Sequence, residues 1–185
     1  EDQGRKIMVW DKNVVFFPRR VNGMIYMLHR IKPDIQLVKL NSLEELNPEF
    51  WQSYLLRFEE SIILTPRHNH EVSYIGAGCP PVETASGWLL IYHGVHDTVG
   101  GYVYTACAAL LDLANPEKEI SRLPYALFKP EASWELKGEV NNVCFPTGTV
   151  VRDGRLYIYY GAADERIACA SVMVNDLVDE LLKYK

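Results

Sequence analysis

The sequence predicts an all-β fold built from repeated antiparallel hairpins, and three observations lead to this prediction. Turns containing Asn-Gly, Ser-Gly or Asp-Gly lie between apolar runs at residues 21–23, 85–87 and 152–154, and such turns are strong hairpin signals. The turn glycines recur with a period of about 65 residues, which indicates a structural repeat. Similar strand-like segments precede and follow each turn, so every repeat has the same order of elements.

Each repeat contains three strand-like segments in a fixed order. The segments before the turns are NVVFFP (13–18), GAGCPPV (76–82) and NNVCFP (141–146). The segments after the turns are MIYMLHR (24–30), WLLIYHG (88–94) and RLYIYYG (155–161). The apolar segments that follow these are DIQLVKL (34–40), YVYTACAALLDL (102–113) and RIACASVMV (166–174). Hairpins repeated in this way build the four-stranded sheets that are the blades of a β-propeller, and strands this short do not suit alternating helix–strand units.

The number of repeats limits how much of a propeller the chain can form. A propeller usually needs at least four blades around its channel. This chain supplies about three, the last of which can be incomplete. We therefore expect residues 1–185 to be one partial propeller domain, the C-terminal part of a longer chain whose N-terminal blades are absent. A β-sandwich whose turns share a spacing by coincidence is the alternative fold.

Two segments carry helical patterns. The segment NSLEELNPEFW at 41–51 predicts a helical turn between blades. The segment NDLVDELLKYK at 175–185 has leucines at helical spacing and predicts a short C-terminal helix. Asn175 and Asp176 are the candidate N-caps of that helix.

Composition and charge narrow the class of protein. Of 185 residues 48% are apolar, which is enough for a core, and the net charge of −5 argues against a general binder of nucleic acid or anionic membranes. No apolar run approaches the roughly 18 residues of a membrane helix, and the opening EDQGRKIMVW has neither an initiator Met nor a signal pattern. The four cysteines lie far apart without a CxxC pair, so we expect free thiols in the reducing cytoplasm.

Polar side chains recur at the ends of the strands that follow the turns. His29, His93 and Tyr160 each lie six positions after a turn glycine, and Asp97 and Asp164 each lie ten positions after one. In a propeller the inner strands end at one rim of the channel, so this register predicts that the five side chains surround one opening as a binding site. Solvated loop residues are the alternative interpretation of each one alone.

Two histidine clusters and a glycine-rich segment predict no metal or nucleotide site. The motifs RHNH (67–70) and HGVH (93–96) lack the helical spacing of a His-pair zinc site and have no cysteine nearby. The segment GAG (76–78) is followed by CPP and not by a helix, so it is not a phosphate loop. Its glycines allow close backbone approach, and Pro80 and Pro81 stiffen the loop.

Four long motifs in a fixed order carry a family resemblance. They are DKNVVFFPRRVNGMIYMLHR, IGAGCPPVETASGWLLIYHGV, ALLDLANPEKEISRL and GEVNNVCFPTGTVVRDGRLYIYYGAADERIACA. With these motifs the chain resembles, over nearly all of its length, the mannoside phosphorylases of glycoside hydrolase family 130. The resemblance implies a five-bladed β-propeller that acts on β-mannosides.

The resemblance also implies roles for individual residues. Lys12 and His29 match members of a phosphate site, with Arg30 as a third member. By resemblance and repeat position, the residues expected to shape the sugar subsites are Pro80 and Pro81 of the GAGCPP loop, His93, Asp97, Tyr160 and Asp164. The general acid of the family is an aspartate in the N-terminal half, and no segment here matches it. We therefore expect no catalytic residue within this chain.

The function that the resemblance implies is phosphorolysis of a β-mannoside with inversion, which releases mannose 1-phosphate. It uses inorganic phosphate as co-substrate and no cofactor, and its partner is an oligosaccharide or disaccharide, not nucleic acid or a membrane. A hydrolase of the same family and a non-catalytic carbohydrate-binding fragment are the alternatives. Lys12 and His29 favour the phosphorylase, because a hydrolase needs a carboxylate base instead of a phosphate site. The open edge of a partial propeller leaves homo-oligomers as an open alternative.

Overall fold

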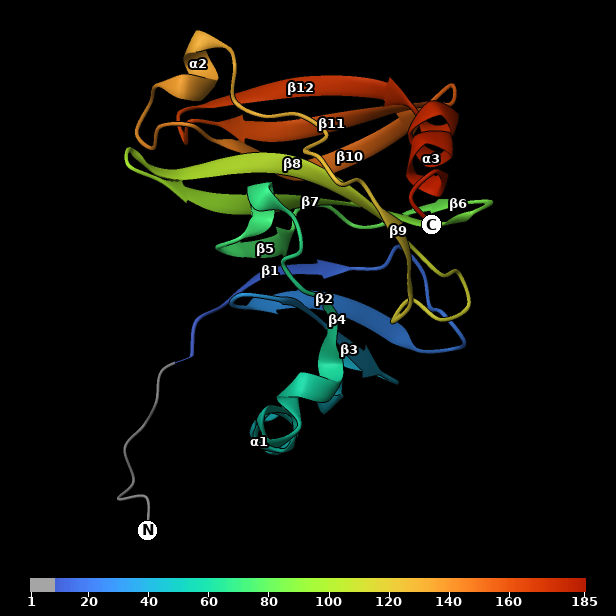
Figure 1. Ribbon diagram of the computed structural model, residues 1–185. Helices are drawn as coiled ribbons and strands as arrows, with labels where there is room; N and C mark the ends of the chain where they lie inside the picture. Colours follow the sequence, from blue (N-terminus) through green and yellow to red (C-terminus); the bar gives the residue numbers. More distant parts are fainter. Residues whose placement is uncertain (1–8) are drawn as a thin grey trace, which may run out of the picture.

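The protein forms three antiparallel sheets that follow one another along the chain (Figure 1). The computed structural model describes residues 9–185, so the first eight residues of the opening segment discussed above lie outside the described part. Sheet 1 contains, in spatial order, β1 (Asp11–Phe16), β2 (Ile25–Ile31), β3 (Ile35–Leu40) and β4 (Ile62–Leu64). Sheet 2 contains β5 (Tyr74–Ala77), β7 (Gly87–Thr98), β8 (Gly101–Leu111) and β9 (Glu119–Arg122), with β6 (Val82–Thr84) also paired to β7. Sheet 3 contains β10 (Cys144–Arg152), β11 (Arg155–Ala162) and β12 (Arg166–Met173).

The repeated hairpins are confirmed, and two of the three turns have the expected geometry. Asn22 and Gly23 have φ angles of 51° and 80°, and Asp153 and Gly154 have φ angles of 51° and 73°. Positive φ at both central residues is the signature of the type I′ turn, which matches the twist of the strands on either side. Asparagine, aspartate and glycine adopt this conformation at the lowest cost, so these dipeptides determine where the hairpins turn.

The turn of sheet 2 is built differently. Thr84 pairs with Gly87, so Ala85 and Ser86 form the turn and Gly87 is already the first residue of β7. The Thr84 hydroxyl donates to the Gly87 carbonyl at 2.7 Å. A Cβ atom on Gly87 would lie 2.5 Å from the Leu111 carbonyl oxygen, so this glycine allows close strand packing instead of a left-handed turn. Registers counted from the turn glycine are therefore displaced by one residue in sheet 2.

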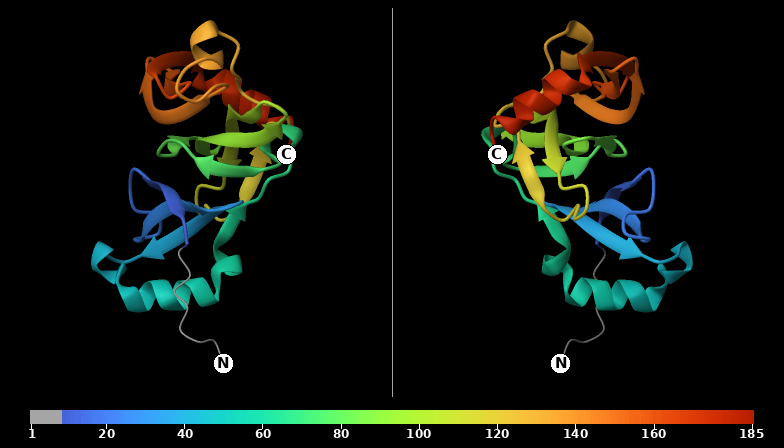
Figure 2. Two further views of the ribbon diagram at one scale, coloured as in Figure 1. Left: turned by 90° about the vertical axis from the view of Figure 1, so that its left-hand side faces the viewer. Right: turned by 90° about the vertical axis from the view of Figure 1, so that its right-hand side faces the viewer.

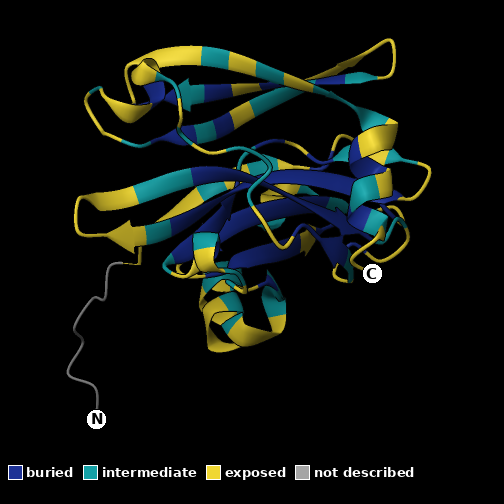
Figure 3. Cartoon of the chain, turned by 45° about the horizontal axis from the view of Figure 1, so that its top comes forward, coloured by how far each residue is buried: buried dark blue, intermediate teal, exposed yellow. Residues whose placement is uncertain are grey.

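Sheet 2 shares a core with each neighbouring sheet. On β7, Trp88, Leu90 and Tyr92 belong to the core with sheet 1, whereas Leu89 and Ile91 belong to the core with sheet 3. This alternation follows from the period of two along a strand. Figure 3 shows the buried residues gathered in the middle layers of the molecule and the exposed ones at its edges and loops. Both faces of sheet 2 are therefore interior.

Helix α1 (Pro48–Leu56) covers the face of sheet 1 that points away from sheet 2 (Figures 1 and 2). The expected helical turn in this segment is confirmed as a short 3₁₀ turn (Leu43–Glu45) followed by this longer helix. The Asn47 side chain caps the helix by accepting from the Phe50 amide at 2.9 Å, and Pro48 occupies the first turn. The side chains that pack on sheet 1 from this side are Phe50, Trp51 and Tyr54.

The C-terminal helix is confirmed as α3 (Val174–Leu182), but its predicted N-caps are wrong. The helix begins earlier than expected, with Met173 at the N-cap position and no side-chain cap. The reason is that β12 runs directly into the helix and the Val174 amide donates to the Gly154 carbonyl at 2.9 Å, so a tertiary contact takes the place of a side-chain cap. The helix buries Leu177, Val178 and Leu181 beside sheets 2 and 3.

The connections that lead into sheets 2 and 3 each present a buried glutamate to a strand tyrosine. Glu71 accepts a hydrogen bond from Tyr92, and Glu135 of α2 (Ser133–Leu136) accepts one from Tyr160 at 2.6 Å. Each glutamate also accepts from two backbone amides of its own turn. We call these two arrangements the Glu–Tyr latches, because they fasten each connection to its sheet.

The described residues contain neither a membrane-spanning helix nor a disulfide bond. No helix in the 9–185 part has the length and apolar character to cross a membrane. The cysteines are free thiols; Cys79, Cys107 and Cys144 are buried and Cys169 is exposed.

Candidate functional site

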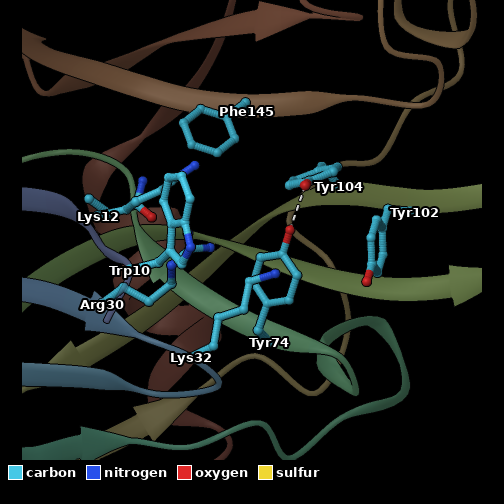
Figure 4. A pocket seen from close by; sticks show the side chains of 9 residues that line it. Trp10, Lys12, Arg30, Lys32, Tyr74, Tyr102, Tyr104 and Phe145 are labelled. Carbon is cyan, nitrogen blue, oxygen red and sulfur yellow. Dashed lines mark hydrogen bonds between the residues drawn. The ribbon is translucent and has the colours of Figure 1, made fainter. Parts of the chain in front are cut away.

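A cavity of about 490 Å³ opens where sheets 1, 2 and 3 approach one another. The residues that line it are Trp10, Lys12, Asn13, Arg30, Lys32, Tyr74, Tyr102, Tyr104 and Phe145. We call it the basic pocket, because three of these residues are cationic and none of the described lining residues is acidic. Figure 4 shows the three basic side chains gathered beside Trp10, with Tyr102 and Tyr104 on the opposite side.

An irregularity in β1 places two polar residues at the pocket. The pairing register between β1 and β2 shifts between Lys12 and Val15, and Asn13 has a φ angle of 59°. Such bulges bend a strand and re-aim its side chains. The Lys12 ammonium lies 5.3 Å from the centroid of the Trp10 ring, and the buried Asn13 Oδ1 has no hydrogen-bond partner among the described residues.

The end of β2 and the turn that follows it supply the other two cations. Arg30 lies on β2, Lys32 lies in the turn just after it, and both side chains line the pocket. Both approach the Tyr74 ring, with 4.8 Å between its centroid and the Arg30 guanidinium carbon and 3.7 Å between it and the Lys32 ammonium. The negative face of an aromatic ring attracts cations, so Tyr74 holds the two charges at the pocket wall.

Burial and neighbouring positive charges lower the pKa of Lys32. Burial is the largest cause that lowers the Lys32 pKa, followed by the positive charges of Arg30 and Lys12, while Asp97 acts in the opposite direction. Repulsion among cations is relieved when an anion binds between them. The arrangement therefore favours a ligand that carries more than one negative charge.

Aromatic rings form the rest of the wall. Tyr74 and Tyr104 are joined by a hydrogen bond of 2.5 Å between their hydroxyl groups, and Phe145 lies next to Tyr104 with ring centroids 6.1 Å apart. Ring faces next to polar groups suit a ligand with one apolar and one hydroxyl-bearing side, as sugars have. Tyr104 and Phe145 also line a second cavity of about 240 Å³, where Asp164 stands.

The structure places the predicted phosphate residues on two sides of sheet 1. Lys12 and Arg30 pair across β1 and β2 and line the basic pocket. His29 points to the opposite face and is fully buried, with its Nδ1 2.9 Å from Asp11 Oδ1 and its Nε2 2.6 Å from the Tyr54 hydroxyl. This separation follows from the alternation of side chains along β2. The phosphate role of all three stays a prediction.

The expected convergence of His29, His93 and Tyr160 needs correction. Measured from the first paired residue after each turn, His29 and Tyr160 lie five positions along and His93 lies six. The residue of sheet 2 that corresponds to His29 is therefore Tyr92, and His93 faces the other way. The cause is the displaced turn at Ala85 and Ser86. Together with the burial of all three side chains, this means that they do not share one opening.

His93 lies directly behind the basic pocket. Its ring centroid is 4.4 Å from that of Phe145, and a Cβ atom on Gly76 would lie 2.6 Å from its Cε1. Burial, together with the charge of Arg30, lowers the His93 pKa to about 3, so the ring is neutral at ordinary pH. Neither ring nitrogen has a partner among the described residues.

The remaining predicted sugar residues are spread over several places. Tyr160 is buried in its latch with Glu135. Asp97 is exposed at the end of β7, close enough for its charge to raise the Lys32 pKa. Pro80 is exposed and Pro81 buried between β5 and β6, and neither lines the basic pocket. Of these residues, only Asp164 stands in a cavity that borders the basic pocket.

Sequence reasoning missed Lys32 and the tyrosine wall, which consists of Tyr74, Tyr102 and Tyr104. A signal was present for two of the tyrosines, because Tyr102 and Tyr104 are separated by the strand period of two in GYVYTACA. This spacing indicates a shared face, but only the packing of the sheets shows that it meets the basic residues.

His70, Glu71 and Cys107 are close enough together to be tested as a metal site. The donor set does not fit one, because the Glu71 carboxylate already accepts from Tyr92 and from the buried Arg122 guanidinium at 3.1 Å. A guanidinium at that distance opposes a second cation. The cluster is better understood as the centre of the first Glu–Tyr latch.

Comparisons with known proteins give one consistent family. The model for glycoside hydrolase family 130, described as β-1,4-mannooligosaccharide phosphorylase, matches residues 2–183. The 1,2-β-oligomannan phosphorylase of Thermoanaerobacter sp. strain X514 is 37% identical over 180 residues, covering 95% of this chain and 56% of that protein. The β-1,4-mannooligosaccharide phosphorylase of Ruminococcus albus is 35% identical over 174 residues, covering 92% of this chain and 50% of that protein.

A solved structure gives the same result for the fold. The β-1,2-mannobiose phosphorylase of Listeria innocua, in complex with β-1,2-mannobiose, matches with a TM-score of 0.78 and 28% sequence identity. The match covers 92% of this chain and 46% of that one. The chain thus spans about half the length of the relatives that it matches.

Proposed function

Because this chain belongs to glycoside hydrolase family 130, we propose that it supplies the phosphate-binding wall of a phosphorylase that cleaves β-mannosides. The complete site would lie in the channel of a five-bladed propeller to which the three sheets contribute their blades. The chain covers about half of its relatives, so the activity we propose is that of the whole propeller.

The convergence of Lys12, Arg30 and Lys32 on one pocket carries this proposal. In phosphorolysis a phosphate oxygen attacks the anomeric carbon, the glycosidic bond breaks and the leaving oxygen takes a proton from a general acid. Phosphate is already a nucleophile, so the site needs cations that hold it in line more than it needs a base. Attack from the face opposite to the leaving group inverts the configuration and gives mannose 1-phosphate. The general acid would come from the half of the propeller outside this chain.

The makeup of the pocket favours phosphorolysis over hydrolysis. An inverting hydrolase needs a second carboxylate to activate water, and no acidic residue is among the described residues that line the basic pocket. Asp164, in the neighbouring cavity, would contact a sugar hydroxyl across the shared wall of Tyr104 and Phe145. The tyrosine wall would hold the mannoside next to the phosphate.

Phosphate-dependent release of mannose 1-phosphate from a panel of β-mannosides tests the proposal. The chain would be assayed alone and fused behind the N-terminal part of the 1,2-β-oligomannan phosphorylase, which supplies the length that this chain does not cover. We expect product from the fusion only, and only with phosphate present. Release of free mannose without phosphate would indicate the hydrolase. Sugar binding without turnover in either form would favour the carbohydrate-binding fragment.

A further inference from the structure

A continuous hydrogen-bonded series runs behind the basic pocket, on the α1 side of sheet 1. His29 Nδ1 is 2.9 Å from Asp11 Oδ1, and His29 Nε2 is 2.6 Å from the Tyr54 hydroxyl. Tyr54 donates to Ser61 Oγ at 2.7 Å, and Ser61 donates to the Phe58 carbonyl at 2.6 Å. The histidine is fully buried, so these partners decide which of its nitrogens carry protons.

The donor and acceptor of each hydrogen bond follow from the group at the end of the series, the Phe58 carbonyl. The Phe58 carbonyl can only accept, so the single hydroxyl proton of Ser61 is directed at it. Ser61 Oγ must then accept the single proton of Tyr54, and the Tyr54 oxygen must accept from His29 Nε2–H. Burial raises the Tyr54 pKa to about 12, so the phenol keeps that proton.

The other end of the ring faces a carboxylate. Ionised Asp11 can only accept, so a proton also lies on His29 Nδ1. With both nitrogens donating, the ring would be an imidazolium ion paired with Asp11. A neutral ring could satisfy only one of these two acceptors.

The charge of Asp11 matters because of its neighbour. Asp11 directly precedes Lys12, which lines the basic pocket, so the two charges lie within a Debye length of each other. An uncompensated carboxylate at this position would offset the Lys12 charge and repel an anion. An imidazolium at His29 would compensate the negative charge of Asp11. The three cations of the basic pocket would then keep their full attraction for an anion.

We propose that Tyr54 and Ser61 are positioning residues, which hold His29 as an imidazolium paired with Asp11 and so preserve the positive field of the basic pocket. The segment between β3 and β4 thereby tunes anion binding from the far side of sheet 1. The effect on phosphate rests on the proposed function, whereas the state of the His29 ring does not.

Nuclear magnetic resonance of the histidine ring nitrogens tests the ring state directly, at neutral pH in the 185-residue chain, with His29→Gln to assign the signals. We expect both His29 nitrogens to be protonated. Ser61→Ala leaves Tyr54 free to donate to Nε2 and should convert the ring to a neutral, Nδ1-protonated form. Trp51→Phe is the matched control, because Trp51 packs edge-on to the same ring at 5.8 Å without a hydrogen bond to it. A singly protonated wild-type ring, or no change in Ser61→Ala, would overturn the proposal.

Titration with inorganic phosphate tests the consequence. Tyr54→Phe and Ser61→Ala should weaken phosphate binding about tenfold while mannose binding and the Trp51→Phe control stay unchanged. Unchanged phosphate affinity in variants with an altered ring would refute the link to the pocket. Absence of phosphate binding in the wild type would refute the proposed function and this link, while the ring signals would still decide whether Tyr54 and Ser61 position His29.

Discussion

At the scale of the residue, the basic pocket is defined by three cationic side chains whose charged groups meet in it. Lys12 comes from an irregular β1, Arg30 from the end of β2 and Lys32 from the turn that follows it. Tyr74 lies under two of them and holds both positive groups at the pocket wall. A site kept cationic in this way gives up stability when empty and regains it when an anion binds.

Removal of one cation should therefore weaken the binding of phosphate and leave the binding of sugar unchanged. We expect Lys12→Met to weaken inorganic phosphate binding by about tenfold to a hundredfold, the value of a charged hydrogen bond, with mannose affinity unchanged. Calorimetric titration with each ligand measures both. Lys118→Met, at an exposed lysine that does not line the pocket, is the control. Equal losses for phosphate and mannose would contradict the phosphate assignment.

His93 makes the stability of the chain depend on pH. Its folded pKa is about 3, below the ordinary value of 6.5, so protons bind to the unfolded chain first. The stability that this provides is complete above pH 6.5 and is lost as the pH falls toward 3. We expect the free energy of unfolding to fall by about 2 kcal/mol more in the wild type than in His93→Gln between pH 7 and pH 5. Urea unfolding at the two pH values measures this difference, and equal losses would show that His93 is not buried as a neutral ring.

At the scale of the element, the hairpins were predictable and their exact registers were not. Asn-Gly and Asp-Gly specify type I′ turns because both central positions need positive φ. The Ala85–Ser86 turn carries no such requirement, and Gly87 is used for close packing instead. A shift of one residue reverses every side chain of a strand. For this reason the sequence pointed to His93 where the structural counterpart of His29 is Tyr92.

The Glu–Tyr latches should differ in strength because their surroundings differ. Glu71 also pairs with Arg122, whose side chain is 1% exposed, whereas Glu135 has no such ion pair among the described residues. Glu71→Gln leaves a buried guanidinium without this partner and should cost about 3 kcal/mol. Glu135→Gln should cost about 1 kcal/mol, the value of one hydrogen bond. Denaturant titration of both variants checks the order, and a larger loss for Glu135→Gln would refute this account.

At the scale of the whole molecule, repeats indicated a propeller before any packing was known. The spacing of the turns was sufficient for that, since each repeat specifies one sheet. The position of the basic pocket was not predictable in the same way, because it depends on five strands from three sheets. Lys12 and Arg30 could be named from resemblance, whereas Tyr104 and Phe145 could be placed there only after the sheets were packed.

The shared cores predict how the three sheets unfold. Solenoid-like arrays can lose their repeats one at a time, because each repeat contacts only its neighbours. Here β7 contributes Trp88 to one core and Ile91 to the other, so opening either core exposes a face of sheet 2. We therefore expect a single transition, with tryptophan fluorescence and far-ultraviolet circular dichroism coincident in urea. Leu28→Ala in the first core and Ile158→Ala in the second should each move this whole transition by about 2–5 kcal/mol. If Ile158→Ala instead split the curve into two steps, sheet 3 would be an independent unit and the two cores would not be coupled through sheet 2.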